Sequence, residues 1–324
     1  MLMLEAGHEV DLGSTELRAG AARAGLALLI TLAVSLPIGL AIGAFFPAGH
    51  SLLLVVLLAG SSAAVAFPTI RERGLTGPAI AMVITWITSA DAATAVLMPL
   101  TLSNASRIPL ALVGDGLIIA FAGASILFAR RLFRTSLADE VKRESKHRHW
   151  ALQLRISVLL LLALAAIAEG TGASLLVAGF AAGIVLRRFN EPNRLAQQLT
   201  GLASGFFVPA FFVLLGASLD LSALVHSASA IGLALAMAIG ATAVHVLASV
   251  VAGKEKRLPA GLLASAQLGL PAAAASLGLA SGALEPAVAA ALVAGGVLTL
   301  IPASAGALLL ARKPGGATAA VAPV

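Results

Sequence analysis

Ten apolar segments, each close to the length of a membrane-crossing helix, constrain this chain more than any other feature. They lie near 20–46, 50–69, 76–101, 108–130, 152–168, 171–187, 203–219, 227–252, 258–281 and 286–311. About 20 helical residues cross a hydrocarbon core of roughly 30 Å. With 59% hydrophobic and 11% charged residues, the chain has too little polar surface for a soluble domain of 324 residues. The sequence predicts an all-α polytopic membrane protein of about ten transmembrane helices.

The basic residues predict how these helices are oriented. Membrane insertion keeps Lys and Arg on the cytoplasmic side. If the N-terminus is cytoplasmic, only Arg107 of the 21 Lys and Arg residues falls on the outer side. We therefore expect both termini in the cytoplasm. This distribution explains the basic charge without nucleic acid.

Other classes of function find little support in the composition. The chain has no cysteine, and its 6 histidines are scattered without metal-ligand spacing. No glycine loop follows a strand, so no nucleotide site is predicted. We expect no cofactor, no resident metal and no enzymatic active site.

Polar stretches divide the chain. The expected transmembrane domain covers 1–312, and the segment 134–155 is expected to be a cytoplasmic loop between four spans and six. Its basic residues are typical of contact with anionic membrane lipids, and a regulatory site is the alternative. Residues 313–324 are expected to form a flexible tail.

Asp91 is the most informative residue, because it lies near the middle of an apolar span. Ionisable residues at such depth are functional-site hypotheses by default. Thr88 and Thr94 lie three residues away on either side, with Thr85 and Ser89 also close in sequence. One carboxylate with several neutral oxygens suits a hard monovalent cation. Burial also favours the protonated form, so a proton and a cation would exclude each other here. The alternative is an Asp that only ties helices together.

Two spans show signs of interruption. Ser61 and Ser62 lie within the second span, followed by Pro68, and Gln267 precedes Pro271 in the ninth. Broken helices expose carbonyl oxygens and helix ends that bind ions, and a matched pair indicates an inverted repeat with a site near the midplane. An ordinary kink at Pro68 and a plain interhelical hydrogen bond from Gln267 are the alternatives.

The order of these features resembles the monovalent cation:proton antiporters, in particular the sodium/hydrogen exchanger domain of the Kef-like bacterial branch. The stretches that carry the resemblance are "GHEVDL", "SSAAVAFPTIRERG", the helix with Asp91, "FFVPAFFVLLGASLDL" and "AQLGLPAAAASLG". The resemblance implies two discontinuous crossing helices, Asp91 as carrier of the proton and the cation, and alternating access. It also implies Na⁺ or K⁺ as substrate, a bacterial inner membrane and, as a further partner, a second copy of the chain in a homodimer.

The chain departs from that pattern in three respects. Ala90 stands where relatives often carry Asp, Asn or Gln before the key Asp. His245 is the only candidate for the Lys or Arg that relatives carry in the span equivalent to the eighth. It is interpreted either as a titratable partner of Asp91 or as a packing residue. With one carboxylate, we expect electroneutral exchange. The resemblance also leads us to expect that the first two helices of the family are missing from the start of this chain.

Asp115 is the other buried-looking carboxylate, placed about a third of the way into its span from the outer side. It is a candidate for the ion pathway or for a cap on a neighbouring helix. Two further functions stay open: a channel-like or receptor-like module in which Asp91 is structural, and a truncated or accessory subunit without transport.

Overall fold

Almost every residue that the computed structural model describes is helical. The described residues are 15–46, 50–102, 108–132, 152–171, 173, 175–188, 201–253 and 256–311. Most of the expected loop 134–155, the tail 313–324 and the "GHEVDL" stretch lie outside them. Within the described residues no strand is present. The expected all-α class is thereby confirmed.

Each of the ten predicted segments coincides with one helix or with two consecutive helices. In chain order the elements are α2 Thr15–Phe45, α3 Ser51–Ala59, α4 Ala63–Glu72, α5 Pro78–Leu102, α6 Ile108–Leu132, α8 Leu152–Thr171, α9 Leu175–Arg188, the π-helical turn η2 Ala203–Phe207, α11 Val208–Ser218, α12 Leu221–Val225, α13 Ala228–Ala248, the 3₁₀ turn η3 Ser249–Ala252, α14 Arg257–Ala264, α15 Gly269–Ala280, α16 Pro286–Leu298 and α17 Leu300–Ala311. Within the described residues, 6 helical stretches are long and apolar enough to cross a membrane. Shorter apolar helical stretches of 10–17 residues lie within α6, α8 and α9 and across η2 and α11.

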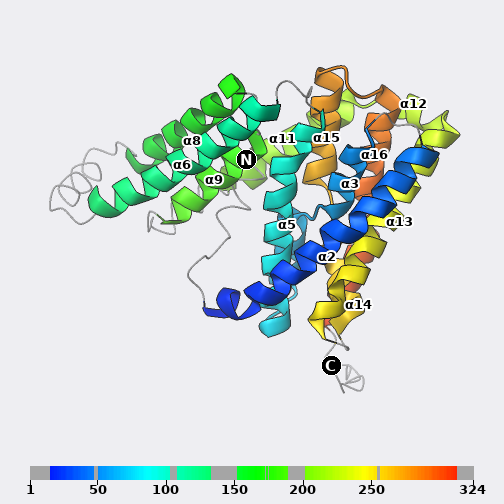
Figure 1. Ribbon diagram of the computed structural model, residues 1–324, viewed down its shortest axis with the longest axis horizontal. Helices are drawn as coiled ribbons and strands as arrows, with labels where there is room; N and C mark the ends of the chain where they lie inside the picture. Colours follow the sequence, from blue (N-terminus) through cyan, green and yellow to red (C-terminus); the bar gives the residue numbers. More distant parts are fainter. Residues whose placement is uncertain are drawn as a thin grey trace, which may run out of the picture.

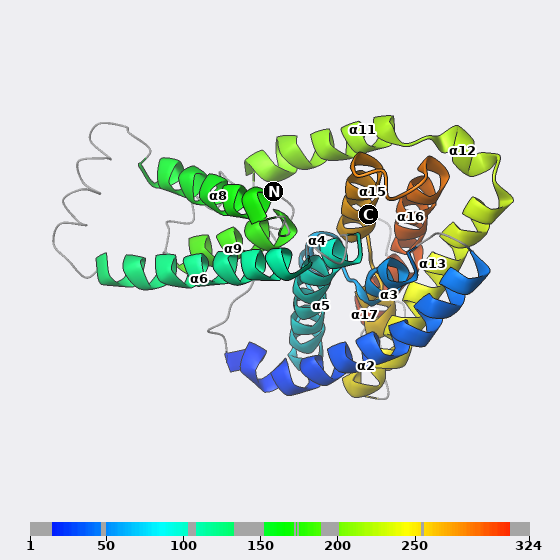
Figure 2. The same ribbon diagram turned by 45° about the horizontal axis from the view of Figure 1, so that its top comes forward.

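The long spans form one bundle, and α6, α8 and α9 form a second group beside it (Figure 1). The bundle consists of α2, α3 with α4, α5, α13, α14 with α15, and α16 with α17, which pack on one another. α5 also contacts α6 and α9, and its Ala95 belongs to the apolar core of the second group. Figure 2 shows the same separation, with α5 between the two groups.

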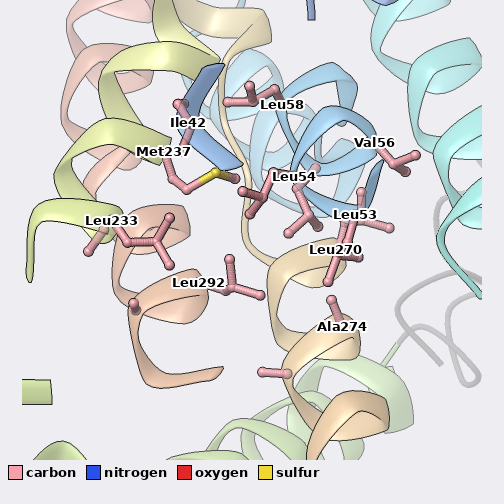
Figure 3. Close-up of a cluster of buried hydrophobic side chains, with 14 of the residues drawn as sticks. Ile42, Leu53, Leu54, Val56, Leu58, Leu233, Met237, Leu270, Ala274 and Leu292 are labelled. Atoms are coloured by element: carbon pink, nitrogen blue, oxygen red, sulfur yellow. The ribbon is translucent and has the colours of Figure 1, made fainter. Parts of the chain in front are cut away.

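Two apolar clusters fill the bundle, one toward each end. The first draws on α3, α15 and α16, and the second on α4, α14 and α17. In the first cluster, Met237 of α13 extends toward Leu54 of α3, and Leu233 of α13 lies on the side of Leu292 of α16 (Figure 3). The halves of each interrupted span thus belong to different clusters, so the interruptions lie between two apolar layers.

Small residues allow these helices to approach closely. A Cβ added to Gly39 of α2 would lie 2.7 Å from backbone atoms of Val55 in α3, and one on Gly306 of α17 would lie 2.6 Å from the amide nitrogen of Leu263 in α14. Helices in lipid associate through such van der Waals contact, because lipid tails are as apolar as the side chains. The Gly content therefore supports the packing of the bundle.

The outer surface of the bundle is apolar. Leu29 of α2 is 64% exposed, Ile239 of α13 68% and Ile301 of α17 70%. Large contiguous apolar surfaces of this kind suit contact with lipid rather than with water. The chain is a multi-pass membrane protein.

Candidate functional site

The second and ninth spans are both interrupted near their middle. α3 has 9 residues and α4 has 10, separated by Gly60–Ser62. α14 has 8 residues and α15 has 12, separated by Ser265–Leu268. Gly60 and Ser62 have extended backbone, with φ and ψ of −68° and 155°, and −125° and 104°. Backbone groups that no helix satisfies therefore meet inside the bundle, as the sequence predicts.

The prolines mark these interruptions unequally. Pro68 lies inside α4, and the chain breaks at Gly60–Ser62 instead, so the prediction that the helix is interrupted at Pro68 is wrong. Pro271 is the third residue of α15, in the first turn after the break. A proline in the first turn costs no helical hydrogen bond, because that N–H has no partner within the helix. Gly60 packs closely on the other span, since a Cβ there would lie 2.7 Å from Leu270.

The two interruptions are joined by reciprocal hydrogen bonds. The side-chain amide of Gln267 donates to the carbonyl oxygen of Gly60 over 2.8 Å. The hydroxyl of Ser61 donates in the opposite sense to the carbonyl oxygen of Ala264, the last residue of α14. Each break thus supplies a side chain to a carbonyl that the other break leaves exposed. This arrangement holds the broken spans across one another.

Asp91 on α5 lies at the start of α4. Its side chain is only 1% exposed, and its Oδ2 accepts a hydrogen bond of 3.2 Å from the backbone N–H of Ala63, the first residue of α4. Helix N-termini carry free N–H groups and a partial positive charge, which favour an anion. The carboxylate is therefore buried at an electrostatically favourable position beside the first interruption.

The predicted hydroxyl residues lie on α5 and in the first interruption. Ser61, Ser62, Thr88 and Thr94 are all buried, and the Thr94 hydroxyl would lie 3.7 Å from a Cβ on Gly60. Thr88 donates to Ile84 O over 2.9 Å, and Thr94 donates to Ala90 O over 2.7 Å. These bonds use the hydroxyl hydrogen but leave oxygen lone pairs that can face a cation.

His245 lies elsewhere in the bundle. Its ring packs on Trp86 of α5 with centroids 5.5 Å apart, and the Trp86 indole N–H donates to Thr31 over 3.1 Å. The Nδ1–H of His245 donates to Ala241 O over 2.9 Å. Its buried Nε2 has no hydrogen-bond partner in the part of the chain that is described. The structure therefore brings His245 together with Trp86, and it gives the imidazole no hydrogen bond to Asp91.

Asp115 belongs to the second helix group. It is 5% exposed and lies on α6, where α6 packs against α8 and α9. The neighbouring Gly114 approaches the side chain of Thr171 on α8. Asp115 thus lies apart from the two broken spans, α3 with α4 and α14 with α15, whose joined interruptions we call the crossing.

Thr299 is a residue of the crossing that the sequence analysis missed. It lies between α16 and α17, is 1% exposed, and its Oγ1 accepts a hydrogen bond of 2.9 Å from the backbone N–H of Gln267. A threonine in an apolar span is common, so no pattern in the sequence distinguishes Thr299. The carbonyls of Gly60 and Ala264 were equally invisible, because backbone atoms carry no sequence signal.

The candidate site contains one charged group, the Asp91 carboxylate. Among the described residues, none of the buried side chains is Lys or Arg, and no group of three or more His, Asp or Glu that suits a metal ion is found. One buried carboxylate, with hydroxyl residues on its own helix and in the adjacent break, can hold a proton or a hard monovalent cation. Tightly bound transition metals would need more nitrogen or carboxylate ligands.

The chain is similar to known proteins in sequence and in fold. Residues 1–311 match the family described as "Sodium/hydrogen exchanger, transmembrane". Over 184 residues the chain is 31% identical to the high-affinity Na⁺/H⁺ antiporter NhaS3 of Synechocystis, a match that covers 53% of this chain and 38% of that protein. The fold is similar to that of the sodium proton antiporter MjNhaP1 of Methanocaldococcus jannaschii, with a TM-score of 0.60, 16% identity, and coverage of 96% of this chain and 80% of that one.

Proposed function

This chain belongs to the sodium/hydrogen exchanger family, and on that premise we propose that it exchanges protons for Na⁺ across the membrane with Asp91 as the shared carrier. The observation that carries the proposal is the placement of a single buried carboxylate at the start of α4, between two crossed broken helices. The name of the relative that matches about half of this chain supports Na⁺ as the cation.

The exchange rests on one negative charge that must always be compensated. A buried carboxylate without a positive partner is costly in a membrane, and a proton or a cation removes that cost. Because both use the same oxygens, the binding of one releases the other. The Ala63 N–H stabilises the carboxylate after the proton has left and before the cation has bound.

Neutral oxygens complete the cation site in this proposal. Thr88 and Thr94 lie on the same helix as Asp91, and Ser61 and Ser62 lie in the adjacent break. The carbonyl oxygens of Gly60 and Ala264 each accept one hydrogen bond and retain a second lone pair. A site with a single full charge and flexible neutral ligands binds weakly enough to release its ion.

The two helix groups provide a basis for alternating access. The crossing and Asp91 lie in the bundle, whereas α6, α8 and α9 have their own apolar core and contact the bundle mainly through α5. We propose that the bundle moves against this group and exposes Asp91 to each side in turn. We also propose a bacterial inner membrane with both termini in the cytoplasm, and a homodimer as the assembly.

A single measurement tests the function. The purified chain is reconstituted into liposomes with an acidic interior and a pH-sensitive dye. We expect added Na⁺ to dissipate the pH gradient and choline to leave it unchanged. K⁺ in a parallel sample reports selectivity, and a potential-sensitive dye reports whether charge moves. A gradient that decays equally with Na⁺ and choline would rule out exchange, and rapid decay in every solution would indicate a channel.

A further inference from the structure

Thr299 occupies a backbone junction inside the bundle. It follows the last residue of α16 and precedes the first residue of α17, and its side chain is 1% exposed. The two helices are nearly continuous here, because Thr299 N–H bonds to the carbonyl of Gly296 over 3.1 Å and Ala303 N–H bonds to Thr299 O over 3.1 Å. Thr299 thus lies in regular helical backbone, and its hydroxyl contacts the second interruption.

The hydroxyl satisfies a backbone group that no helix can satisfy. It accepts the N–H of Gln267 over 2.9 Å and donates to Gly296 O over 2.6 Å. Gln267 lies within the break between α14 and α15, where its N–H has no helical partner. A buried N–H in a membrane requires such a bond, because water is absent. Thr299 thus holds the backbone of the second interruption.

The same residue is linked to Asp91 through the crossing. Gln267, held through its backbone by Thr299, donates its side-chain amide to Gly60 O in the first interruption. Three residues after Gly60, the Ala63 N–H binds Asp91. A chain of hydrogen bonds and short backbone segments therefore connects Thr299 to the carboxylate.

The two interruptions share one pattern of hydrogen bonds. In the first, the N–H three residues after the accepting carbonyl of Gly60 binds the side chain of Asp91 on α5. In the second, the N–H three residues after the accepting carbonyl of Ala264 binds the side chain of Thr299. Thr299 is the uncharged counterpart of Asp91. Gly296 also packs closely against the second interruption, since a Cβ added to it would lie 3.2 Å from Gln267 O.

We infer that Thr299 is a positioning residue for the exchange: its hydroxyl holds Gln267, and through Gln267 it holds the first interruption in the geometry in which Asp91 binds its cation. The inference rests on the proposed function. Thr299 does not touch the ion in this account, and it acts on the affinity of the site through the crossing.

Two variants of Thr299 separate its hydroxyl from its shape. Thr299→Val keeps the volume and removes the hydrogen bonds, whereas Thr299→Ser keeps them. Thr242→Val is the matched control, because Thr242 is half-buried on α13 and donates only to Ala238 O of its own helix over 2.8 Å. We expect Thr299→Val to raise the half-saturating Na⁺ concentration about tenfold while the maximal rate changes less, and we expect Thr299→Ser and Thr242→Val to behave like the wild type.

Hydrogen–deuterium exchange tests the contact without transport. In detergent, peptides that contain Gln267 should exchange at least several-fold faster in Thr299→Val than in the wild type, with no change in Thr242→Val. Thr299→Ala is measured alongside, so that a second hydroxyl-free variant is available if the first is recovered poorly.

A double-mutant comparison tests the route through Gln267. If Thr299 acts through that side chain, Thr299→Val should have little further effect in a Gln267→Met background. Wild-type affinity and unchanged amide exchange in Thr299→Val would overturn the inference, as would fully additive effects. If the wild-type chain does not transport Na⁺, the proposed function is wrong. The amide-exchange result would still test the contact between Thr299 and Gln267.

Discussion

The side chain of Gln267 donates a 2.8 Å hydrogen bond to Gly60 O, which joins two interrupted spans that lie 207 residues apart in the sequence. Both groups are buried in the bundle, where water cannot replace a lost partner. This bond, with the Ser61 bond to Ala264 O, connects the broken spans directly at the level of their interruptions.

Gln267→Met is expected to weaken both stability and exchange. It keeps the approximate length of the side chain but leaves Gly60 O without its donor, which costs about 1–3 kcal/mol for a buried carbonyl. Unfolding in mixed micelles should show this loss, and the half-saturating Na⁺ concentration for exchange should rise. Ser281→Ala is the control, since Ser281 is exposed, directly follows α15 and donates back to Leu277 O of that helix. Equal unfolding curves for the wild type and Gln267→Met would show that the bond does not support the crossing.

Close packing of α2 on α3 predicts a sharp difference between two glycines of one helix. A Cβ on Gly39 would lie 2.7 Å from Val55 backbone atoms, whereas one on Gly25 would meet nothing within 4 Å. We expect Gly39→Ala to destabilise the bundle by about 1–3 kcal/mol through overpacking, and Gly25→Ala to be neutral or slightly stabilising. Melting of the detergent-solubilised protein measures both, and equal effects would contradict the packing described.

His245 is expected to matter for packing more than for exchange. His245→Phe should preserve the contact with Trp86 and leave Na⁺ exchange within about twofold, because the imidazole has no hydrogen bond to Asp91. His245→Ala should cost about 2–4 kcal/mol through the cavity beside Trp86. Emission from Trp86, with Trp150→Phe to remove the other indole, should shift to the red in the alanine variant. Loss of exchange in His245→Phe would make His245 part of the ion pathway.

The sequence predicts most of the fold because lipid allows few solutions. Apolar length and the placement of basic residues are enough to locate all ten apolar helical segments within a few residues. Ser61, Ser62 and Pro68 indicated an interrupted second span but not its exact bounds, because the break depends on Gln267 and Ser61 finding carbonyls across the bundle. Pro68 suggested the wrong position, since a proline inside a helix is tolerated when tertiary contacts hold the chain.

The site was only partly predictable for similar reasons. Asp91, Ser61, Ser62, Thr88 and Thr94 stood out as polar groups at one depth, and the structure gathers them on α5 and the first break. Depth alone, however, says nothing about which face of a helix a residue occupies. His245 therefore packs on Trp86 instead of facing Asp91, and Thr299 faces the second break although it looks ordinary in sequence.

The central claim is that the Asp91 carboxylate carries both the proton and the cation. Asp91→Asn keeps the shape and replaces the charge with an amide. Asp220→Asn is the matched control, because Asp220 is exposed and caps α12 by accepting the Ala223 N–H over 2.8 Å, a role that Asn also fills.

The most direct measurement is Na⁺-driven dissipation of a pH gradient in liposomes that contain the wild type or one of these two variants at equal protein content. We expect Asp91→Asn to reduce the rate to that of empty liposomes, and Asp220→Asn to match the wild type. Dissipation by Asp91→Asn at the wild-type rate would contradict the assignment of Asp91 as the carrier.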